Sequence, residues 1–253
     1  MIAPHFSDGT VSLYLGNAFE VLPALNITAN LLCVDPPYGE TSLEWDRWQD
    51  GWPTLAATAA TSMWCFGSMR MFLEHGGEFT EAGWKFSQDI VWEKHNGSGF
   101  HADRFKRVHE VITHWYLGDW AGQYKDVPTT PDAVARAVRR KQRPTHMGDI
   151  DRGYYTSEDG GPRLMRSVLQ VRSMHGSALH PCQKPLGILD PLIRYACPPG
   201  GLVLDLFAGS GSALDAARQT SRRAVGIEGD ERYAEAAAKR LSQPVLDFEE
   251  AAS

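Results

Sequence analysis

The 253-residue sequence predicts an α/β fold with a mostly parallel sheet. Two short and predominantly apolar runs, 30–34 and 202–206, are typical of strands buried on both faces of a parallel sheet. Each is followed by a segment that cannot continue a strand, because 35–39 contains two consecutive prolines and 207–211 contains two glycines. Helical patterns alternate with such strands, which is the third observation that indicates α/β.

The remaining elements follow in chain order. The first half predicts strands at 11–15, 30–34, 62–66, 90–93 and 111–117, with helices at 18–25, 54–60 and from 69 through 74. The last part predicts helices at 186–197, 212–219 and 231–241, with strands at 202–206 and 224–227. Asp230 is a good N-cap for the last of these helices, and Pro244 ends it.

Between these two ordered regions the pattern deteriorates. Residues 118–179 mix Gly, Pro, Asp, Arg and Tyr, and 131–141 is their one clear helical segment. We therefore predict four parts along the chain. They are a first half of the main domain at 1–117, an inserted region at 118–179, a second half at 180–243 and a mobile tail at 244–253.

Charge is distributed unevenly along the chain. The net charge is -6, which excludes a uniformly basic protein that coats nucleic acid. Residues 94–175, however, contain 14 Lys and Arg against 9 Asp and Glu, a net +5, and the rest carries -11. An acidic body with a basic middle segment indicates one region that meets a polyanion.

Targeting segments and metal motifs are not evident. No basic segment followed by an apolar run begins the chain, and no run reaches the roughly 18 apolar residues of a membrane span. The four cysteines are scattered without zinc spacing, which indicates free thiols in a reducing compartment. His109, Glu110 and His114 resemble a zinc-protease motif with the wrong spacing. We predict a cytoplasmic protein without a membrane partner or a metal site.

The glycine-containing segment at 207–211 has the features of a nucleotide-binding turn. Gly209 and Gly211 let a ligand approach the backbone, and the following helix offers free N–H groups. Glu228 lies 19 positions after Gly209, close to the spacing at which an acid binds a ribose diol. Leu214 occupies the position of the third glycine of a dinucleotide site, so we expect a ribose without a diphosphate. The alternative is a tight turn without a ligand.

Residues 35–38 combine three groups that suit a planar base with an exocyclic amine. Asp35 offers a carboxylate at a strand end, Pro36 offers a carbonyl oxygen and Tyr38 offers an aromatic face. The first two can accept both protons of an NH₂ group, and the ring can stack on the base. The alternative is a rigid turn in which Asp35 caps a backbone group and Tyr38 packs.

The order of these motifs resembles one family. DPPYG at 35–39 followed by FAGSG at 207–211 is similar to the beta class, circularly permuted, of S-adenosylmethionine-dependent DNA amino-methyltransferases, which act on adenine N6 or cytosine N4. Segments 13–20, 92–94, 107–110 and 180–185 resemble further motifs of that family. The resemblance implies a Rossmann-like methyltransferase fold with a mostly parallel seven-stranded sheet. It also implies that 118–179 is an inserted target-recognition region.

The resemblance also implies S-adenosylmethionine as cofactor and a role for each matched residue. Its catalytic residues are Asp35, Pro36, Pro37 and Tyr38. Its cofactor-binding residues are Asn17, Asp35, His180, Gln183, Lys184, Pro185, Asp205, Phe207, Ala208, Gly209, Ser210, Gly211, Ser212 and Glu228. Two residues depart from the family, since Asn17 stands where Asp is usual and Cys182 replaces a usual Thr.

The implied activity is methyl transfer to N6 of a flipped adenine in double-stranded DNA. Cytosine-N4 transfer is the first alternative, because those enzymes more often carry Ser at the first position of the tetrad. A DNA-binding homologue without turnover and an RNA or protein amide methyltransferase are the others. We expect phosphate contacts from Arg136, Arg139, Arg140, Lys141 and Arg143, although a solvated basic helix face is the alternative. A homodimer, a restriction endonuclease partner and the recognised DNA sequence stay open.

Overall fold

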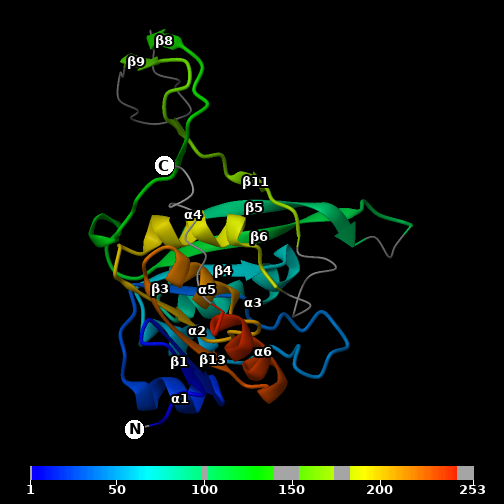
Figure 1. Cartoon of the computed structure of the whole chain (residues 1–253). Coiled ribbons are helices and arrows are strands. Elements are labelled where there is room, and N and C mark those ends of the chain that lie inside the picture. Colours follow the sequence, from blue (N-terminus) through cyan, green and yellow to red (C-terminus); the bar gives the residue numbers. More distant parts are fainter. Residues whose placement is uncertain (1, 99–101, 140–153, 174–182, 244–253) are drawn as a thin grey trace. The chain divides into compact units, whose positions relative to one another are not determined.

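A computed structural model describes residues 2–98, 102–139, 154–173 and 183–243 (Figure 1). The chain divides into two compact units. The larger unit comprises Met1–Asp126 and Ser167–Ser253, and the smaller unit comprises Val127–Arg166. Residues 118–126 and 167–173, which we predicted within the insertion at 118–179, therefore belong to the larger unit.

The larger unit is built on one sheet. Its strands are β1 (Phe6–Ser7), β2 (Val11–Leu15), β3 (Leu31–Val34), β4 (Ser62–Gly67), β5 (Lys85–Ser98), β6 (Arg107–Tyr116), β11 (Val168–Gln170), β12 (Leu202–Asp205) and β13 (Arg223–Glu228). They lie in the order β1-β2-β13-β12-β3-β4-β6-β5-β11. From β2 to β4 every neighbouring pair is parallel, whereas β6 is antiparallel to both β4 and β5.

The described sheet has nine strands, so the predicted number of seven is wrong. The two additional strands are its edges, because β1 pairs with β2 and β11 pairs with β5. Each supplies hydrogen-bond partners to a strand that otherwise presents unpaired backbone groups to solvent. Edge strands of two and three residues are too short to produce a period-two pattern in the sequence.

Helices cover both faces of this sheet. One face packs against α1 (Ala18–Leu25), α2 (Trp52–Ala57) and α3 (Met69–Glu81), and the other against α4 (Leu186–Ala196), α5 (Ser212–Gln219) and α6 (Glu231–Leu241). Strand β3 shows why its sequence is apolar throughout. Leu31 and Cys33 contribute to one hydrophobic core, while Leu32 and Val34 contribute to the other.

Helix starts agree closely with the sequence where a capping residue is present. Asn17 caps α1 by accepting from the Phe19 backbone N–H, and Asp230 caps α6 by accepting from that of Arg232. Helix α2 begins two residues before the predicted start at 54. Gly51 in the left-handed region precedes it and Pro53 occupies its first turn, where a missing N–H costs nothing.

Strands β5 and β6 are longer than predicted. They pair with each other as a long hairpin, from Lys85 opposite Tyr116 to Ser98 opposite Arg107, and extend past the end of β4 (Figure 1). Most side chains of the extension are not buried, so the apolar pattern that marks a strand is limited to its central part.

The smaller unit contains two short β-pairs, and the helix predicted at 131–141 is wrong. β7 (Thr129–Thr130) pairs with β10 (Arg163–Leu164), and β8 (Arg136–Arg139) pairs with β9 (Tyr154–Ser157). Backbone groups of β8 form hydrogen bonds with β9, which is distant in the sequence. The local helical pattern could not reveal this non-local pairing. Within the described part of this segment, the alternative of a basic helix face is therefore also wrong.

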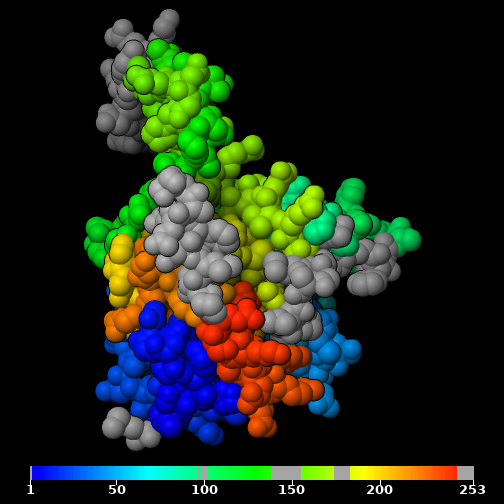
Figure 2. Space-filling model, viewed as in Figure 1, coloured from blue at the N-terminus to red at the C-terminus, as the bar shows by residue number. Residues whose placement is uncertain are grey.

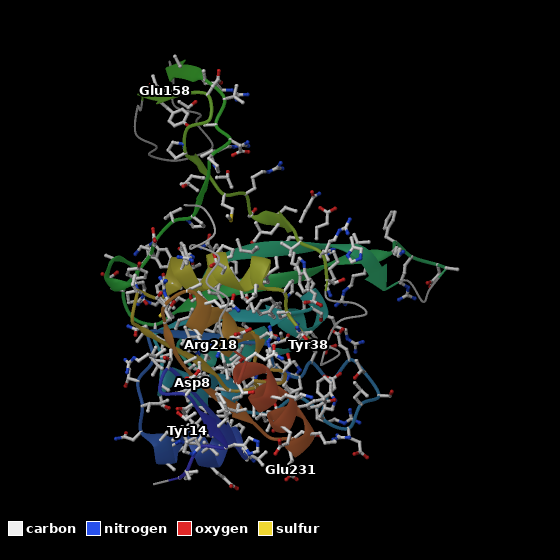
Figure 3. The ribbon with its side chains drawn as sticks, viewed as in Figure 1. Asp8, Tyr14, Tyr38, Glu158, Arg218 and Glu231 are labelled. Atoms are coloured by element: carbon white, nitrogen blue, oxygen red, sulfur yellow. The ribbon has the colours of Figure 1, made fainter. Side chains whose placement is uncertain are left out.

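An arginine connects the N-terminal strands with the last described helix of the larger unit. Arg218 of α5 lies 3.4 Å from Asp8 and 2.8 Å from Asp215, and it donates a 2.6 Å hydrogen bond to the carbonyl of Leu241 in α6 (Figure 3). The N-terminal strands and α6 consequently form neighbouring parts of one surface (Figure 2). Among the described helices, none combines the length and the apolar character needed to cross a bilayer.

We expect Gly226→Ala to destabilise the protein by about 1–3 kcal/mol, because overpacking a well-filled core forces its neighbours apart. A Cβ on Gly226 in β13 would lie 2.5 Å from Leu214 and 3.1 Å from Ala208. The matched control is Gly77→Ala in α3, where a Cβ meets nothing within 4 Å. That change should stabilise the helix by about 0.5–1 kcal/mol. Urea unfolding measures the free energy of unfolding of both variants and of the wild type. Equal free energies of unfolding for the two variants would contradict the packing argument.

Candidate active site

A cavity of about 860 Å³ lies at the carboxyl ends of four neighbouring parallel strands of the larger unit. Asn17 follows β2, Glu228 ends β13, Phe207 follows β12 and Asp35 follows β3, and all four line the cavity. Because β3 and β12 are adjacent and parallel, with Leu31 opposite Val203, their carboxyl ends meet. Ligands of open α/β sheets bind in this crevice.

Most residues predicted for catalysis and cofactor binding are brought together here. The cavity is lined by Asn17, Asp35, Pro36, Pro37, Tyr38, Gln183, Lys184, Asp205, Phe207, Ala208, Gly209, Ser210, Ser212 and Glu228. Pro185 and Gly211, the N-cap residues of α4 and α5, are not in its wall. His180 lies outside the described residues.

The glycine turn is tied to the acid that follows it. One carboxylate oxygen of Glu228 accepts a 2.6 Å hydrogen bond from the Gly209 N–H, and the other accepts a 2.8 Å bond from the Asp230 N–H. Burial raises the pKa of Glu228 above its usual value. Gly211 has φ +72°, and a Cβ there would lie 3.3 Å from Ala237, so glycine allows the turn and the close approach of α6.

Asp205 lies beneath this turn and is almost fully buried. Its side chain accepts a 3.0 Å hydrogen bond from the Phe207 N–H, which holds the start of the turn against the end of β12. Burial raises the pKa of Asp205 to about 8, and the nearby carboxylates of Asp35 and Glu228 add to that shift. A cationic ligand group beside Asp205 would favour the ionised form of its carboxyl group.

Both oxygens of the Asp35 carboxylate have partners. The Tyr38 hydroxyl donates a 2.5 Å hydrogen bond to Oδ1, and Nζ of Lys184 lies 2.5 Å from Oδ2. Burial, together with the negative charge of Asp35, raises the pKa of Tyr38 well above its usual value, so the phenol is a donor. Lys184, predicted to line the cofactor pocket, lines the cavity and also contacts the predicted catalytic carboxylate.

Two charged residues of the β5–β6 hairpin, Glu110 and Lys94, continue the series of ion pairs that begins with Asp35 and Lys184. Nζ of Lys184 also lies 3.5 Å from Oε2 of Glu110, and Lys94 forms an ion pair with the other oxygen of Glu110. Burial raises the pKa of Glu110, but Lys184 and Lys94 reverse that effect and hold it below its usual value. Sequence reasoning placed Lys94 and Glu110 in motifs of the family without predicting this contact.

The resemblance of 109–114 to a zinc-protease motif has no structural counterpart. The segment is a strand, and Nε2 of His114 lies 3.0 Å from the hydroxyl of Ser62, away from Glu110. Burial lowers the pKa of His114 to about 4. Among the described residues, no group of three or more His, Cys, Asp or Glu side chains is arranged to hold a metal ion.

The segment after the tetrad is held by an acid that sequence reasoning missed. Asp46, which is 3% exposed, accepts hydrogen bonds of 2.8 Å from the Gly39 N–H and 2.7 Å from the Thr41 N–H. No spacing rule links an aspartate to a turn seven residues earlier. Of the nearby tryptophans, Trp45 lines the cavity, whereas Trp48 stacks on a histidine of α3.

The residues predicted to contact DNA lie apart from this cavity in the chain. Arg136 is exposed in β8 of the smaller unit, and the backbone of Arg139 ends the same strand. Arg140, Lys141 and Arg143 lie outside the described residues. Their contact with phosphate stays a prediction.

The profile of the DNA methylase family (N6_N4_Mtase) matches residues 29–239. The chain belongs to the DNA methylase family. A related curated protein, the putative methylase YubD of Escherichia coli (strain K12), is 48% identical over 67 residues. That match covers 26% of this DNA methylase and 30% of YubD, so less than a third of that relative's length is spanned.

Several solved structures share the fold of this DNA methylase. The PvuII DNA methyltransferase (cytosine-N4-specific) has a TM-score of 0.66 and 15% identity, over 98% of this chain and 92% of that one. The M1.HpyAVI–SAM complex has a TM-score of 0.64 and 21% identity, over 92% and 100%. TTHA0409 from Thermus thermophilus, complexed with S-adenosyl-L-methionine, has a TM-score of 0.60 and 21% identity, over 93% and 96%. These likenesses confirm the predicted fold, and the circular permutation stays a prediction.

We expect the stability of the protein to fall as the pH rises from about 4 to about 8, in part because of Asp205. Its pKa is near its usual value in the unfolded chain and about 8 in the folded protein, so over this range the folded state binds more protons. Asp205→Asn can still accept the hydrogen bond from Phe207 but does not titrate. The free energy of unfolding of this variant should therefore fall less between pH 6 and pH 8.5 than that of the wild type.

The matched control for this prediction is Asp50→Asn, since Asp50 is exposed and does not line the cavity. Denaturant unfolding at both pH values measures the difference. An Asp205→Asn variant with the same pH dependence as the wild type and the control would contradict the prediction.

Proposed function

We propose that this chain transfers the methyl group of S-adenosylmethionine to the exocyclic amine of a base in double-stranded DNA. The observation that carries this proposal is that Asp35 and Glu228, predicted from separate motifs to face a base and a ribose, line the same cavity. Membership of the DNA methylase family supports it. The S-adenosylmethionine complexes of M1.HpyAVI and TTHA0409, which share the fold, support the choice of cofactor.

The residues of the cavity fit this cofactor chemically. Each carboxylate oxygen of Glu228 accepts one backbone N–H and has a second lone pair with which it can accept a ribose hydroxyl. The sulfonium and ammonium groups of S-adenosylmethionine are cations, and the Asp205 carboxyl group, with its pKa of about 8, can give up its proton to pair with one of them. The aromatic ring of Phe207 and the small Ala208 offer apolar wall for the methionine chain. When bound, the cofactor supplies an activated methyl group.

Asp35 and Pro36 then have a positioning role. The amine of adenine is a weak nucleophile, because its lone pair is delocalised into the ring. When its two N–H groups donate to the Asp35 carboxylate and the Pro36 carbonyl, the lone pair is directed away from both acceptors, towards the methyl group. The target amine is inaccessible in a stacked duplex, so the base must flip out, and Tyr38 stacks on it.

We favour adenine N6 as the acceptor because the first residue of the tetrad is Asp35 rather than Ser. Cytosine N4 is the second candidate, and the structural similarity to the cytosine-N4-specific PvuII enzyme supports it. The experiment is to express the chain in a methylation-deficient host and to quantify methylated nucleosides in its DNA by mass spectrometry. Detection of N6-methyladenine supports the proposal. Detection of N4-methylcytosine would show that cytosine, and not adenine, is the acceptor base. The absence of both overturns the proposal, and then transfer to RNA and protein is assayed with radiolabelled cofactor.

We expect Asp35→Ala to lower the rate of methyl transfer by about 100-fold or more, because the amine loses the acceptor that orients it. Binding of S-adenosylmethionine, measured separately by calorimetry, should persist, since Glu228 and the glycine turn are unchanged. The matched control is Asp50→Ala on the surface. Near-normal turnover by Asp35→Ala would contradict the assigned role.

We expect the basic segment at 136–143 to contribute to DNA affinity by binding phosphates. Neutralising Arg139, Arg140 and Lys141 together should weaken binding and reduce the slope of log Kd against log salt by about 0.9 for each phosphate that the variant no longer neutralises. Fluorescence anisotropy with duplex DNA over a range of KCl concentrations measures both effects. Unchanged affinity and slope would show that the segment does not bind phosphate.

A further inference from the structure

We propose that Lys184 is a positioning residue that selects which oxygen of Asp35 meets the target amine. In this arrangement Lys184 occupies Oδ2, and the hydroxyl of Tyr38 occupies Oδ1 in place of the amine until the base arrives. The proposal rests on the proposed function and adds to it a role for each partner of the carboxylate.

Lys184 is placed to act on Asp35. Its side chain is 9% exposed, and its ammonium lies 2.5 Å from Oδ2 of Asp35 and 5.1 Å from the ring centre of Phe66. A buried ammonium needs hydrogen-bonded anionic partners, and its positive charge beside Oδ2 disfavours a further N–H donor at that oxygen. The other oxygen, Oδ1, is then the one with which the carboxylate can meet a second donor.

Lys184 cannot pair directly with the base amine, so its effect on that amine passes through Asp35. An ammonium has three donors and no acceptor, so it cannot accept an N–H from the target amine. The present partner of Oδ1 supports this assignment. It is the Tyr38 hydroxyl, a hydrogen-bond donor that lies 2.5 Å from Oδ1. An incoming amine N–H has the same polarity and can replace this hydroxyl, which releases the Tyr38 ring to stack on the base.

Glu110 is a second anionic partner of Lys184, 3.5 Å from its ammonium. The four charged groups alternate in sign, from Lys94 through Glu110 and Lys184 to Asp35, and they come from four separate segments of the chain. Removing such charges from water costs several kcal/mol for each ion, so an apolar cluster of similar volume is often as stable. The arrangement is therefore better explained by orientation of Asp35 than by stability.

The decisive variant is Lys184→Met, which keeps an unbranched side chain and removes the charge. We expect kcat for DNA methylation to fall on the order of 100-fold, as for a misplaced catalytic group, while the Kd for S-adenosylmethionine measured by calorimetry stays that of the wild type. Lys239→Met on the exposed face of α6, outside the cavity, is the matched control. An unchanged kcat overturns the proposal. A loss of cofactor affinity that accounts for the lost activity also overturns it, because Lys184 then binds cofactor.

A second pair of variants tests the same contact without removing Lys184. Glu110→Gln should lower kcat less than Lys184→Met does. The double variant should be no slower than Lys184→Met alone, because residues that act through one contact are not additive. Additive losses overturn the assigned path through Lys184, and a Glu110→Gln variant with unchanged kcat overturns the role of Glu110 even if Lys184→Met fails to fold.

Tyr38→Phe tests the role of the hydroxyl. It keeps the ring that stacks and removes the donor that occupies Oδ1. We expect the KM for DNA to fall by about 2- to 10-fold, because the target amine no longer has to displace the hydroxyl from Oδ1. A loss of kcat as large as that of Lys184→Met overturns the exchange of hydroxyl for amine.

These outcomes are distinguishable from failure of the proposed function. A wild-type protein that methylates no DNA overturns that function, and the role of Lys184 in it falls as well. If the wild type methylates DNA and Lys184→Met does so equally fast, the role of Lys184 alone is overturned.

Discussion

The parallel pairing of β3 with β12 is the constraint on which the rest of the site depends. Leu31 and Leu32 lie opposite Val203 and Leu204, so residues separated by about two thirds of the chain end at one edge of the sheet. Strands β13 and β2 continue the same direction and add Glu228 and Asn17 to that edge. A register shift of one residue would exchange the two faces of each strand and turn the cavity side chains away.

Burial decides the electrostatics of this cavity. Asp205 and Glu228 have raised pKa values because the low-dielectric surroundings disfavour their charged forms. Lys184 stabilises Asp35 and Glu110 by direct ion pairs in the same surroundings. The cavity thus combines buried carboxyl groups with a buried ammonium. Their hydrogen bonds and ion pairs orient these groups before a ligand enters. Such preorganisation suits a reaction in which positioning makes the main contribution.

The agreement between sequence and structure is closest where interactions are local or where both faces of an element are buried. Capping by Asn17 and Asp230 locates two helix starts, and the apolar run at 31–34 is a central strand. Prediction fails where a partner is distant. The segment at 136–139 has a helical pattern but pairs as a strand with 154–157, and the short edge strand at 168–170 depends on β5 for its hydrogen bonds.

The sequence by itself determined the fold class, the family and the motifs that supply the predicted site, because glycines, prolines and the acids near them have local conformational and chemical requirements. It also determined that the positive charge is concentrated in the middle of a chain whose net charge is -6. Only the tertiary structure decided that Lys184 contacts Asp35 and Glu110, and that Asp46 holds the turn after the tetrad. The physical reason is that an ion pair across 149 residues depends on strand order and register, which no local pattern encodes.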